Sequence, residues 1–369
     1  MSKPSSRRPP SRSPAAPATP GLRPASVEQA IAKSHEPPNP FEVLSGVIAD
    51  PLKALADLRG RPLLAYYLSD AAQMADEQMA SLYLHLREIG EQEDLDLFLV
   101  SRGGATEVPW KIVSLLREFT KRWSVLVPYR AHSSATLTAL GADVIMMTRM
   151  SELGPIDPSR RHPMLPKDET EQDGKVPLAI SVQDLRHVLE FLKREVGEDI
   201  TPQIAAEMHT ALFDKVHPLA IGALEQSWAL SIQVARNALE THMDPVAEKD
   251  KIDHIVTQLS DHYKSHLYQL NRREVAALGL PVEEATDAEE DAMWALHQAF
   301  ASLRVQGEAE LNGQKMTAMG IGYIASPAAL TVGLGHAPVG KVEKGFVATT
   351  WETRNAAPAA PTAEVPPPA

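Results

Sequence analysis

The hydrophobic pattern of this chain is dominated by two short apolar runs that each end in a polar corner. Residues 95–100 (LDLFLV) run into SRGG at 101–104, and residues 123–128 (WSVLVP) run into AHSSAT at 131–136. Runs of this length predict buried strands, and the apolar stripe between them, at 110–119, predicts a helix packed on a sheet. Because parallel strands end at the same edge of a sheet, we expect the two corners to lie side by side.

Further strands and helices alternate along the chain. Residues 62–69 and 144–147 have the composition of buried strands, and residues 76–89 predict a helix with one apolar face. From 181 to 306 the pattern is mostly helical, with an interruption at 265–270. Residues 322–326 and 342–351 predict strands of a C-terminal β-hairpin or small sheet. Strands that alternate with helices favour an α/β fold with right-handed crossovers.

Composition divides the chain into four parts. Residues 1–41 hold ten prolines, and residues 355–369 are rich in Ala and Pro, so both tails are expected to be disordered. Either tail would act as a solubilising segment or as a polyproline docking segment. Residues 42–285 form the predicted main domain, helical from 181 to 285, and residues 286–354 a helix followed by the β-hairpin. The polar stretch 159–178 predicts a loop, either a cover for a site or a plain surface insertion.

Charge and cysteine content narrow the function classes. The formal net charge is -12, whereas a nucleic-acid binder usually has a basic face, so we expect no nucleic-acid partner. The absence of cysteine excludes disulfides, a cysteine nucleophile and thiolate metal sites. No apolar run reaches the roughly 20 residues that span a bilayer. The pair Arg7-Arg8 lacks the apolar stretch of an export signal, so we expect a cytoplasmic protein without a membrane span.

The two corners offer the groups that acyl transfer needs. Gly103 and Gly104 would expose backbone N–H groups, and Ser133 would present a hydroxyl at a helix start, where the dipole favours negative charge. Each feature alone has a plainer interpretation, because glycines also make tight turns and serine is a common N-cap. Ser134 is the competing nucleophile. The combination of the two corners favours a nucleophile over an N-cap for Ser133, and the choice between Ser133 and Ser134 stays open at this point.

The motifs around these corners resemble a known superfamily. SRGG (101–104), YRAHSSATL (129–137), Ala142-Asp143 and LGPIDP (153–158) are similar to motifs of the Clp-protease/crotonase superfamily. They are most similar to the serine dehydrogenase proteinase family, relatives of the signal peptide peptidase A proteases. The resemblance covers residues 55–285. It implies a spiral of β-β-α units with an added helical region and a small C-terminal β element. It also implies a homo-oligomer, for which the helical segment 181–262 would be an assembly surface.

The resemblance also implies roles for the corner residues. Ser133 would be the nucleophile, and the backbone amides of Gly103, Gly104 and Ser134 would form the oxyanion hole. Two positions depart from the pattern, because the family usually has glycine where Ala135 stands and the superfamily often has proline where Arg102 stands. Arg102 would then either bind a carboxylate of the substrate or remain solvated.

The base and the acid are exchanged relative to Clp-type proteases. In those enzymes a histidine follows the nucleophile helix, and the acid precedes a Glu-Ala…Gly-Leu element. In this chain Asp157 stands at the histidine position, and His266 falls near the acid position. A Ser133–His266–Asp157 triad keeps the roles, because triads are defined by geometry and not by chain order. The residues themselves also allow Asp157 to be a turn starter and His266 a satisfied polar side chain.

Two further candidates stay open. The signal peptide peptidase branch uses a serine–lysine dyad, for which Lys215 is the alternative base; such a lysine must be desolvated to lose its proton. His262 and His266 are one helical turn apart and form a candidate metal pair. The sequence shows no clear third ligand, so we expect neither a metal nor a cofactor.

These observations predict a serine peptidase that acts on a peptide or protein substrate. Ser133 would be acylated, and the acyl-enzyme would then be hydrolysed. One alternative is a scaffold that keeps the fold without its chemistry and recruits partners through its tails. Another is a crotonase-like acyl-CoA enzyme, in which two backbone N–H groups hold a thioester enolate.

Overall fold

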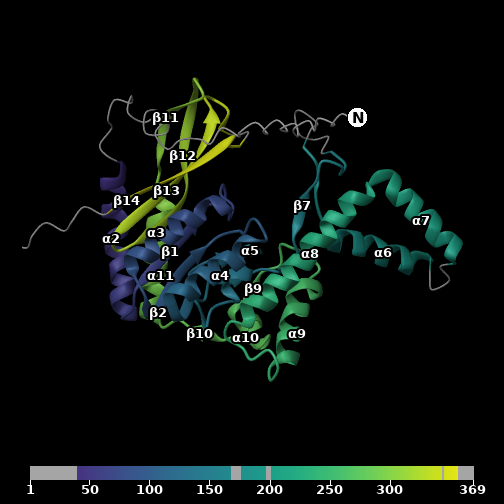
Figure 1. Ribbon diagram of the computed structural model, residues 1–369, viewed down its shortest axis with the longest axis horizontal. Coiled ribbons are helices and arrows are strands. Elements are labelled where there is room, and N and C mark those ends of the chain that lie inside the picture. The colour runs from purple at the N-terminus through teal and green to yellow at the C-terminus, as the bar shows by residue number, and fades with distance from the viewer. Residues whose placement is uncertain (1–39, 168–175, 197–200, 343–344, 356–369) are drawn as a thin grey trace, which may run out of the picture.

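A computed structural model describes residues 40–167, 176–196, 201–342 and 345–355 of the chain (Figure 1). The predicted disordered tails therefore lie outside the described residues, apart from three positions. Residues 40 and 41 belong to helix α2 (Pro40–Arg59), and residue 355 ends strand β14 (Ala348–Asn355).

The centre of the fold is a nine-stranded sheet, and five of its strands are parallel. These strands follow one another in the order β10-β5-β3-β2-β1. They are β1 (Leu63–Leu68), β2 (Gln92–Val100), β3 (Thr120–Val127), β5 (Val144–Met147) and β10 (Val282–Glu284). The predicted strands at 62–69, 95–100, 123–128 and 144–147 are thus present, and the predicted α/β class is confirmed.

Helices cover both faces of this sheet because its strands are apolar on both sides. Leu97 and Leu99 of β2 face one core and Phe98 and Val100 face the other, as the two-residue period of a strand requires. The first face is covered by α3 (Met79–Ile89), α4 (Val108–Phe119), α5 (Ser134–Ala139), α8 (Pro218–Leu239) and α9 (Lys249–Thr257). The second face is covered by α2 and α11 (Asp287–Ser302), which pack on each other.

The C-terminal strands extend the sheet and do not form a separate hairpin. Four antiparallel strands lie here: β11 (Gln306–Leu311), β12 (Gln314–Ser326), β13 (Ala329–Pro338) and β14. Strand β12 pairs with β1, so the meander continues the main sheet. The prediction of a small hairpin from 322–326 and 342–351 was therefore incomplete: it missed β11 and β13 and began the last strand six residues too early.

A second, small sheet lies where the parallel strands end. It consists of β4 (Arg130–Ala131), β6 (Glu152–Leu153) and β9 (Leu270–Asn271), and Ser101 forms a parallel bridge with Ala131 beside it. Long strand, short extended segment and helix thus recur as β2–Ser101–α4 and β3–β4–α5. This recurrence is the spiral of β-β-α units that was predicted.

Two helices, α6 (Val182–Val196) and α7 (Pro202–Lys215), form an arm that projects from the sheet (Figure 1). A two-stranded ribbon of β7 (Ser159–Arg161) and β8 (Ala179–Ser181) leads into α6, and α8 follows α7. The predicted loop at 159–178 thus begins in this ribbon, and its residues 168–175 lie outside the described part. Helix α9 continues into a π-helix (Gln258–His262), and α10 (Arg272–Ala277) follows. In the described ranges, no helix is both long and apolar enough to cross a membrane.

Candidate active site

Ser133 occupies a strained corner between β4 and α5. Its backbone has φ 52° and ψ -116°, a region that non-glycine residues seldom enter and that costs about 1–3 kcal/mol. Ser133 precedes the first helical residue, yet its side chain makes no capping hydrogen bond to α5. Its hydroxyl is half-buried and not engaged as a cap, so the N-cap interpretation does not account for this serine.

Gly103 packs directly against this corner. A Cβ at residue 103 would lie 2.8 Å from the Ser133 Cβ, 2.8 Å from the His132 carbonyl oxygen and 3.0 Å from the Ser134 amide nitrogen. Its φ of +102° is also one that side chains disfavour. Gly104 meets the backbone of Met74, where a Cβ would lie 2.2 Å from the carbonyl oxygen. Both glycines are therefore required by close approach, and the two predicted corners lie side by side.

The amides of Gly104 and Ser134 are the ones available beside Ser133. The Gly103 N–H donates to Ser101 Oγ at 3.0 Å, and the Gly103 carbonyl accepts from the Met74 N–H at 2.8 Å. The Gly104 N–H lies on the opposite side of that same peptide plane, so it points away from Met74. Within the described ranges, no protein oxygen accepts a hydrogen bond from the Gly104 or Ser134 amide. This pair offers two free donors next to one hydroxyl.

The Ser134 side chain has a structural partner. Ser134 is buried, and its Oγ donates to the Gly104 carbonyl oxygen at 2.8 Å, with the Ala105 carbonyl oxygen 3.3 Å away. This bond fixes the glycine loop against the start of α5. The hydroxyl of Ser134 is thus engaged, whereas that of Ser133 has no hydrogen-bond partner among the residues that the structure describes.

Asp157 and His266 form the second half of the candidate site. The carboxylate of Asp157, whose residue is only 4% exposed, lies 3.1 Å from His266 Nδ1. This hydrogen bond raises the pKa of His266 above its usual value, against the opposing effect of burial. Because Nδ1 faces Asp157, Nε2 is the ring nitrogen left to exchange a proton. The predicted exchange of positions therefore gives a real His–Asp contact.

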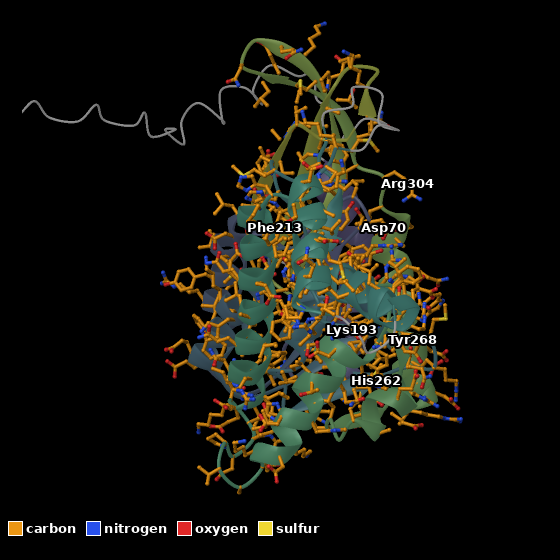
Figure 2. All side chains as sticks on the ribbon, turned by 90° about the vertical axis from the view of Figure 1, so that its right-hand side faces the viewer. Asp70, Lys193, Phe213, His262, Tyr268 and Arg304 are labelled. Atoms are coloured by element: carbon orange, nitrogen blue, oxygen red, sulfur yellow. The ribbon has the colours of Figure 1, made fainter. Side chains whose placement is uncertain are left out.

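Both partners of this pair are held by nearby backbone. The Ile156 N–H donates to the Leu259 carbonyl in the π-helix at 3.0 Å, which fixes the segment carrying Asp157. The loop with His266 runs from the π-helix to β9, which pairs with β6. Figure 2 looks from the side of the arm and labels His262, the last residue of the π-helix, and Tyr268, which lies in this loop.

Contacts of Gly154 join the two halves. A Cβ at Gly154 would lie 3.3 Å from the His132 Cβ, and the Gly154 N–H donates to the Thr136 hydroxyl at 3.0 Å. A positive charge on His266 is also among the causes that lower the pKa of His132, although burial is the main one. Within the described residues, no hydrogen bond joins Ser133 to His266 directly. Such bonds often form only in the substrate complex.

Lys215 lies apart from these groups. It ends helix α7 on the arm, its side chain is 79% exposed, and its Nζ lies 3.1 Å from Asp214. The desolvation that a base lysine needs is absent at this position.

His132 and Arg102 complete the surroundings of Ser133. His132 Nε2 lies 3.0 Å from Glu152 Oε1, although its N–H is not aligned for a hydrogen bond, and burial lowers the pKa of His132 to about 4. His132 was not predicted to be a site residue, although its place directly before Ser133 was an available signal. Arg102 is half-exposed and forms an ion pair with Asp70 at 3.0 Å, and Arg130 pairs with the same carboxylate.

A cavity of about 230 Å³ opens beside the His–Asp pair. Its lining includes Asp157, His266, Gln183, Tyr263 and Leu267. Nowhere in the described part of the chain are three or more His, Cys, Asp or Glu side chains arranged to hold a metal ion. The candidate metal residue His262 packs instead against Tyr263, with ring centroids 5.2 Å apart.

Comparison with known proteins gives distant relatives. No protein-family model matches the chain. Two uncharacterized proteins of Methanocaldococcus jannaschii, MJ1495 and MJ0137, are 26% identical over 190 residues and 22% identical over 189 residues. Each match covers 46% of this chain, and it spans 64% and 65% of the length of the respective relative.

Two solved structures are also similar, and both are of a protease. They are variants of the 1510-N membrane-bound stomatin-specific protease, one of them in complex with a substrate peptide. Both are 14% identical to this chain, with TM-scores of 0.33 and 0.32. The matches cover 66% and 63% of this chain and 82% of each protease chain.

Proposed function

We propose that this protein is a serine peptidase with Ser133 as its nucleophile. The observation that carries the proposal is the packing of Gly103 against the strained Ser133 corner, with the free amides of Gly104 and Ser134 beside it. A free hydroxyl next to two unengaged N–H donors is the arrangement that acyl transfer requires. The His266–Asp157 pair adds a base whose second ring nitrogen is unengaged by Asp157.

The proposed reaction proceeds through an acyl-enzyme. Ser133 Oγ attacks the carbonyl carbon of the scissile peptide bond while His266 Nε2 takes the hydroxyl proton. The Gly104 and Ser134 amides donate to the oxyanion, and each such donor contributes about 3–4 kcal/mol. The intermediate then expels the amine, which receives the proton from His266. Water attacks the ester by the same route and releases the acid and Ser133, while Asp157 stabilises the imidazolium at each step.

Labelling with a fluorophosphonate probe tests the nucleophile. The probe forms a covalent bond to an activated serine, and peptide mass spectrometry locates it. We expect the wild type to be labelled at Ser133 and Ser133→Ala to be unlabelled. Ser134→Ala should still be labelled because it retains its amide, but more slowly because it loses the hydroxyl that fixes the glycine loop. Labelling at another residue, or no labelling of the wild type under conditions that label a control serine protease, contradicts the proposal. Binding of a CoA thioester that survives Ser133→Ala would favour the crotonase-like alternative.

We also propose that the arm is a contact between copies of this chain. Val188 and Phe191 of α6 are 49% and 50% exposed, and Phe213 of α7, labelled in Figure 2, is 48% exposed. No residue of α7 is buried in the described structure. Amphipathic helices of this length are marginal in water unless another surface covers their apolar face. Helix α6 carries equal numbers of acidic and basic residues, so close approach of two copies is little opposed by the negative charge of the whole chain.

Light scattering after size-exclusion chromatography tests the arm contact. We expect the wild type to be oligomeric and the double variant Val188→Asp with Phe191→Asp to dissociate. Lys193→Glu changes an exposed polar position of the same helix and serves as the control. A monomeric wild type, or a double variant that keeps the wild-type mass, contradicts this proposal.

A further inference from the structure

Thr136 connects the two halves of the candidate site through its hydroxyl. The residue is 0% exposed and lies in the first turn of α5. Its Oγ1 accepts from the Gly154 N–H at 3.0 Å and lies 2.7 Å from the Ala131 carbonyl oxygen and 2.9 Å from that of Gly154, to either of which it donates. Ala131 stands two residues before Ser133, and Gly154 three residues before Asp157.

The position of this hydroxyl follows from the end of a strand pair. The β4–β6 ladder stops at the pair Ala131 and Leu153. Beyond it the chain turns into the Ser133 corner on one side and toward Asp157 on the other. The Thr136 hydroxyl contacts the backbone of both segments there, at the carbonyl of Ala131 and at the N–H and carbonyl of Gly154, so a side chain joins the two segments where the ladder stops.

We propose that Thr136 is a positioning residue of the active site, which sets the Asp157 segment relative to Ser133. The proposal rests on the proposed function, because it gives Ser133 and Asp157 their roles. Without the hydroxyl, the buried Gly154 N–H loses its acceptor, and the segment must move to find another. Such a shift changes how Asp157 meets His266 and how His266 faces Ser133.

Thr138 provides a matched control in the same helix. It is also buried, but its Oγ1 donates to the carbonyl of Ser134 one turn earlier, at 3.0 Å. In the described structure this bond stays within α5 and does not touch the Asp157 segment. Thr136→Val and Thr138→Val thus make the same chemical change, a hydroxyl replaced by a methyl group, with different partners.

The test measures the rate of fluorophosphonate labelling of folded protein as a function of pH. Labelling needs neutral His266, so the rate rises with pH through the pKa of that residue. The titratable groups around His266 include Asp157, Asp184 at the start of α6 and His132. His187 of α6 and Lys264 of the same loop line the cavity beside it as well. Because the Asp157 bond raises the pKa of His266, a weakened bond moves the midpoint of the pH–rate profile to lower pH. It also lowers the labelling rate on the high-pH plateau of that profile.

We expect Thr136→Val to lower the plateau about 10- to 100-fold, as a misplacement of up to 1 Å does, and to lower the midpoint. Thr136→Ser keeps the hydroxyl and is expected to retain the wild-type midpoint and most of the rate. Thr138→Val is expected to lower stability without moving the midpoint. If Thr136→Val matches Thr138→Val in both rate and midpoint, Thr136 has no positioning role. If the wild type is not labelled at Ser133 at all, it is the proposed function that fails.

Discussion

Gly103→Ala is the substitution whose effect the structure defines most sharply. The new Cβ would lie 2.8 Å from the Ser133 Cβ, whereas carbon atoms in contact are usually about 3.5–4.0 Å apart. The Ser133 corner must therefore move by roughly 1 Å to accommodate the methyl group. A displacement of that size lowers a well-oriented reaction about 100-fold, which corresponds to about 2.7 kcal/mol of activation free energy.

Backbone strain must be separated from this displacement. Gly103 has φ +102°, and a side chain at positive φ carries a backbone strain whether or not it meets another atom. Gly90 ends α3 with φ +75°, and a Cβ there would meet nothing within 4 Å. Gly90→Ala therefore reports the strain alone, far from the glycine loop.

The assay combines urea unfolding with fluorophosphonate labelling of the folded protein. We expect both variants to lose stability and only Gly103→Ala to lose labelling by about 100-fold. A Gly103→Ala protein that is labelled within about threefold of Gly90→Ala would refute the reasoning, because the nucleophile would then not depend on the absence of a Cβ at residue 103.

Three further predictions concern the base and a buried histidine. His266→Ala should slow labelling by about 1,000-fold or more, while Lys215→Ala, on an exposed arm position, should leave it unchanged; the reverse result would reinstate the lysine as base. Asp157→Asn should shift the midpoint of the pH–rate profile to lower pH, because the bond that raises the pKa of His266 is lost; an unchanged midpoint would show that Asp157 does not act on the base. Burial holds the pKa of His85 at about 4, below its unfolded value, so the unfolded chain takes up the proton first as pH falls. The free energy of unfolding should therefore drop by up to about 3 kcal/mol between pH 6.5 and 4 because of this group. Urea titrations of His85→Gln should show a smaller drop, and an identical drop would show that the pKa of His85 is not lowered.

The parallel half of the fold could be predicted because its strands are apolar on both faces. Runs such as 95–100 and 123–128 stand out from the surrounding helices, and their polar ends mark one edge of the sheet. The antiparallel C-terminal strands were harder to predict, because β13 carries Gly333 and Gly335 at positions where apolar side chains would indicate a strand. The structure explains these glycines: a Cβ at residue 333 would lie 2.6 Å from the Trp351 ring, and one at residue 335 would lie 2.5 Å from the Phe346 ring. Close cross-strand packing of this kind has no local sequence signal.

The two corners of the candidate site could be predicted from the sequence more directly than the pair of Asp157 and His266. The corners at 101–104 and 131–136 follow from strand ends, and their juxtaposition could be inferred from parallel topology alone. Asp157 and His266 are 109 residues apart, so their contact could be anticipated only from the family resemblance. The hydrogen bonds of the Ser134 and Thr136 hydroxyls could not be predicted, because the sequence does not indicate which distant carbonyl a serine or threonine in a first helical turn will bond.

The place of β1 in the sheet has a consequence for how the protein is made. Every residue of β1 is buried, and the strand pairs with β2 on one side and with β12 on the other. A nascent chain that ends before residue 314 therefore carries an apolar strand with one row of unpaired peptide groups, a ready template for another chain. During synthesis, this edge is protected only after most of the protein has left the ribosome. Truncation before residue 314 thus affects solubility as well as shape, because it removes β12, the strand that pairs with this edge of β1.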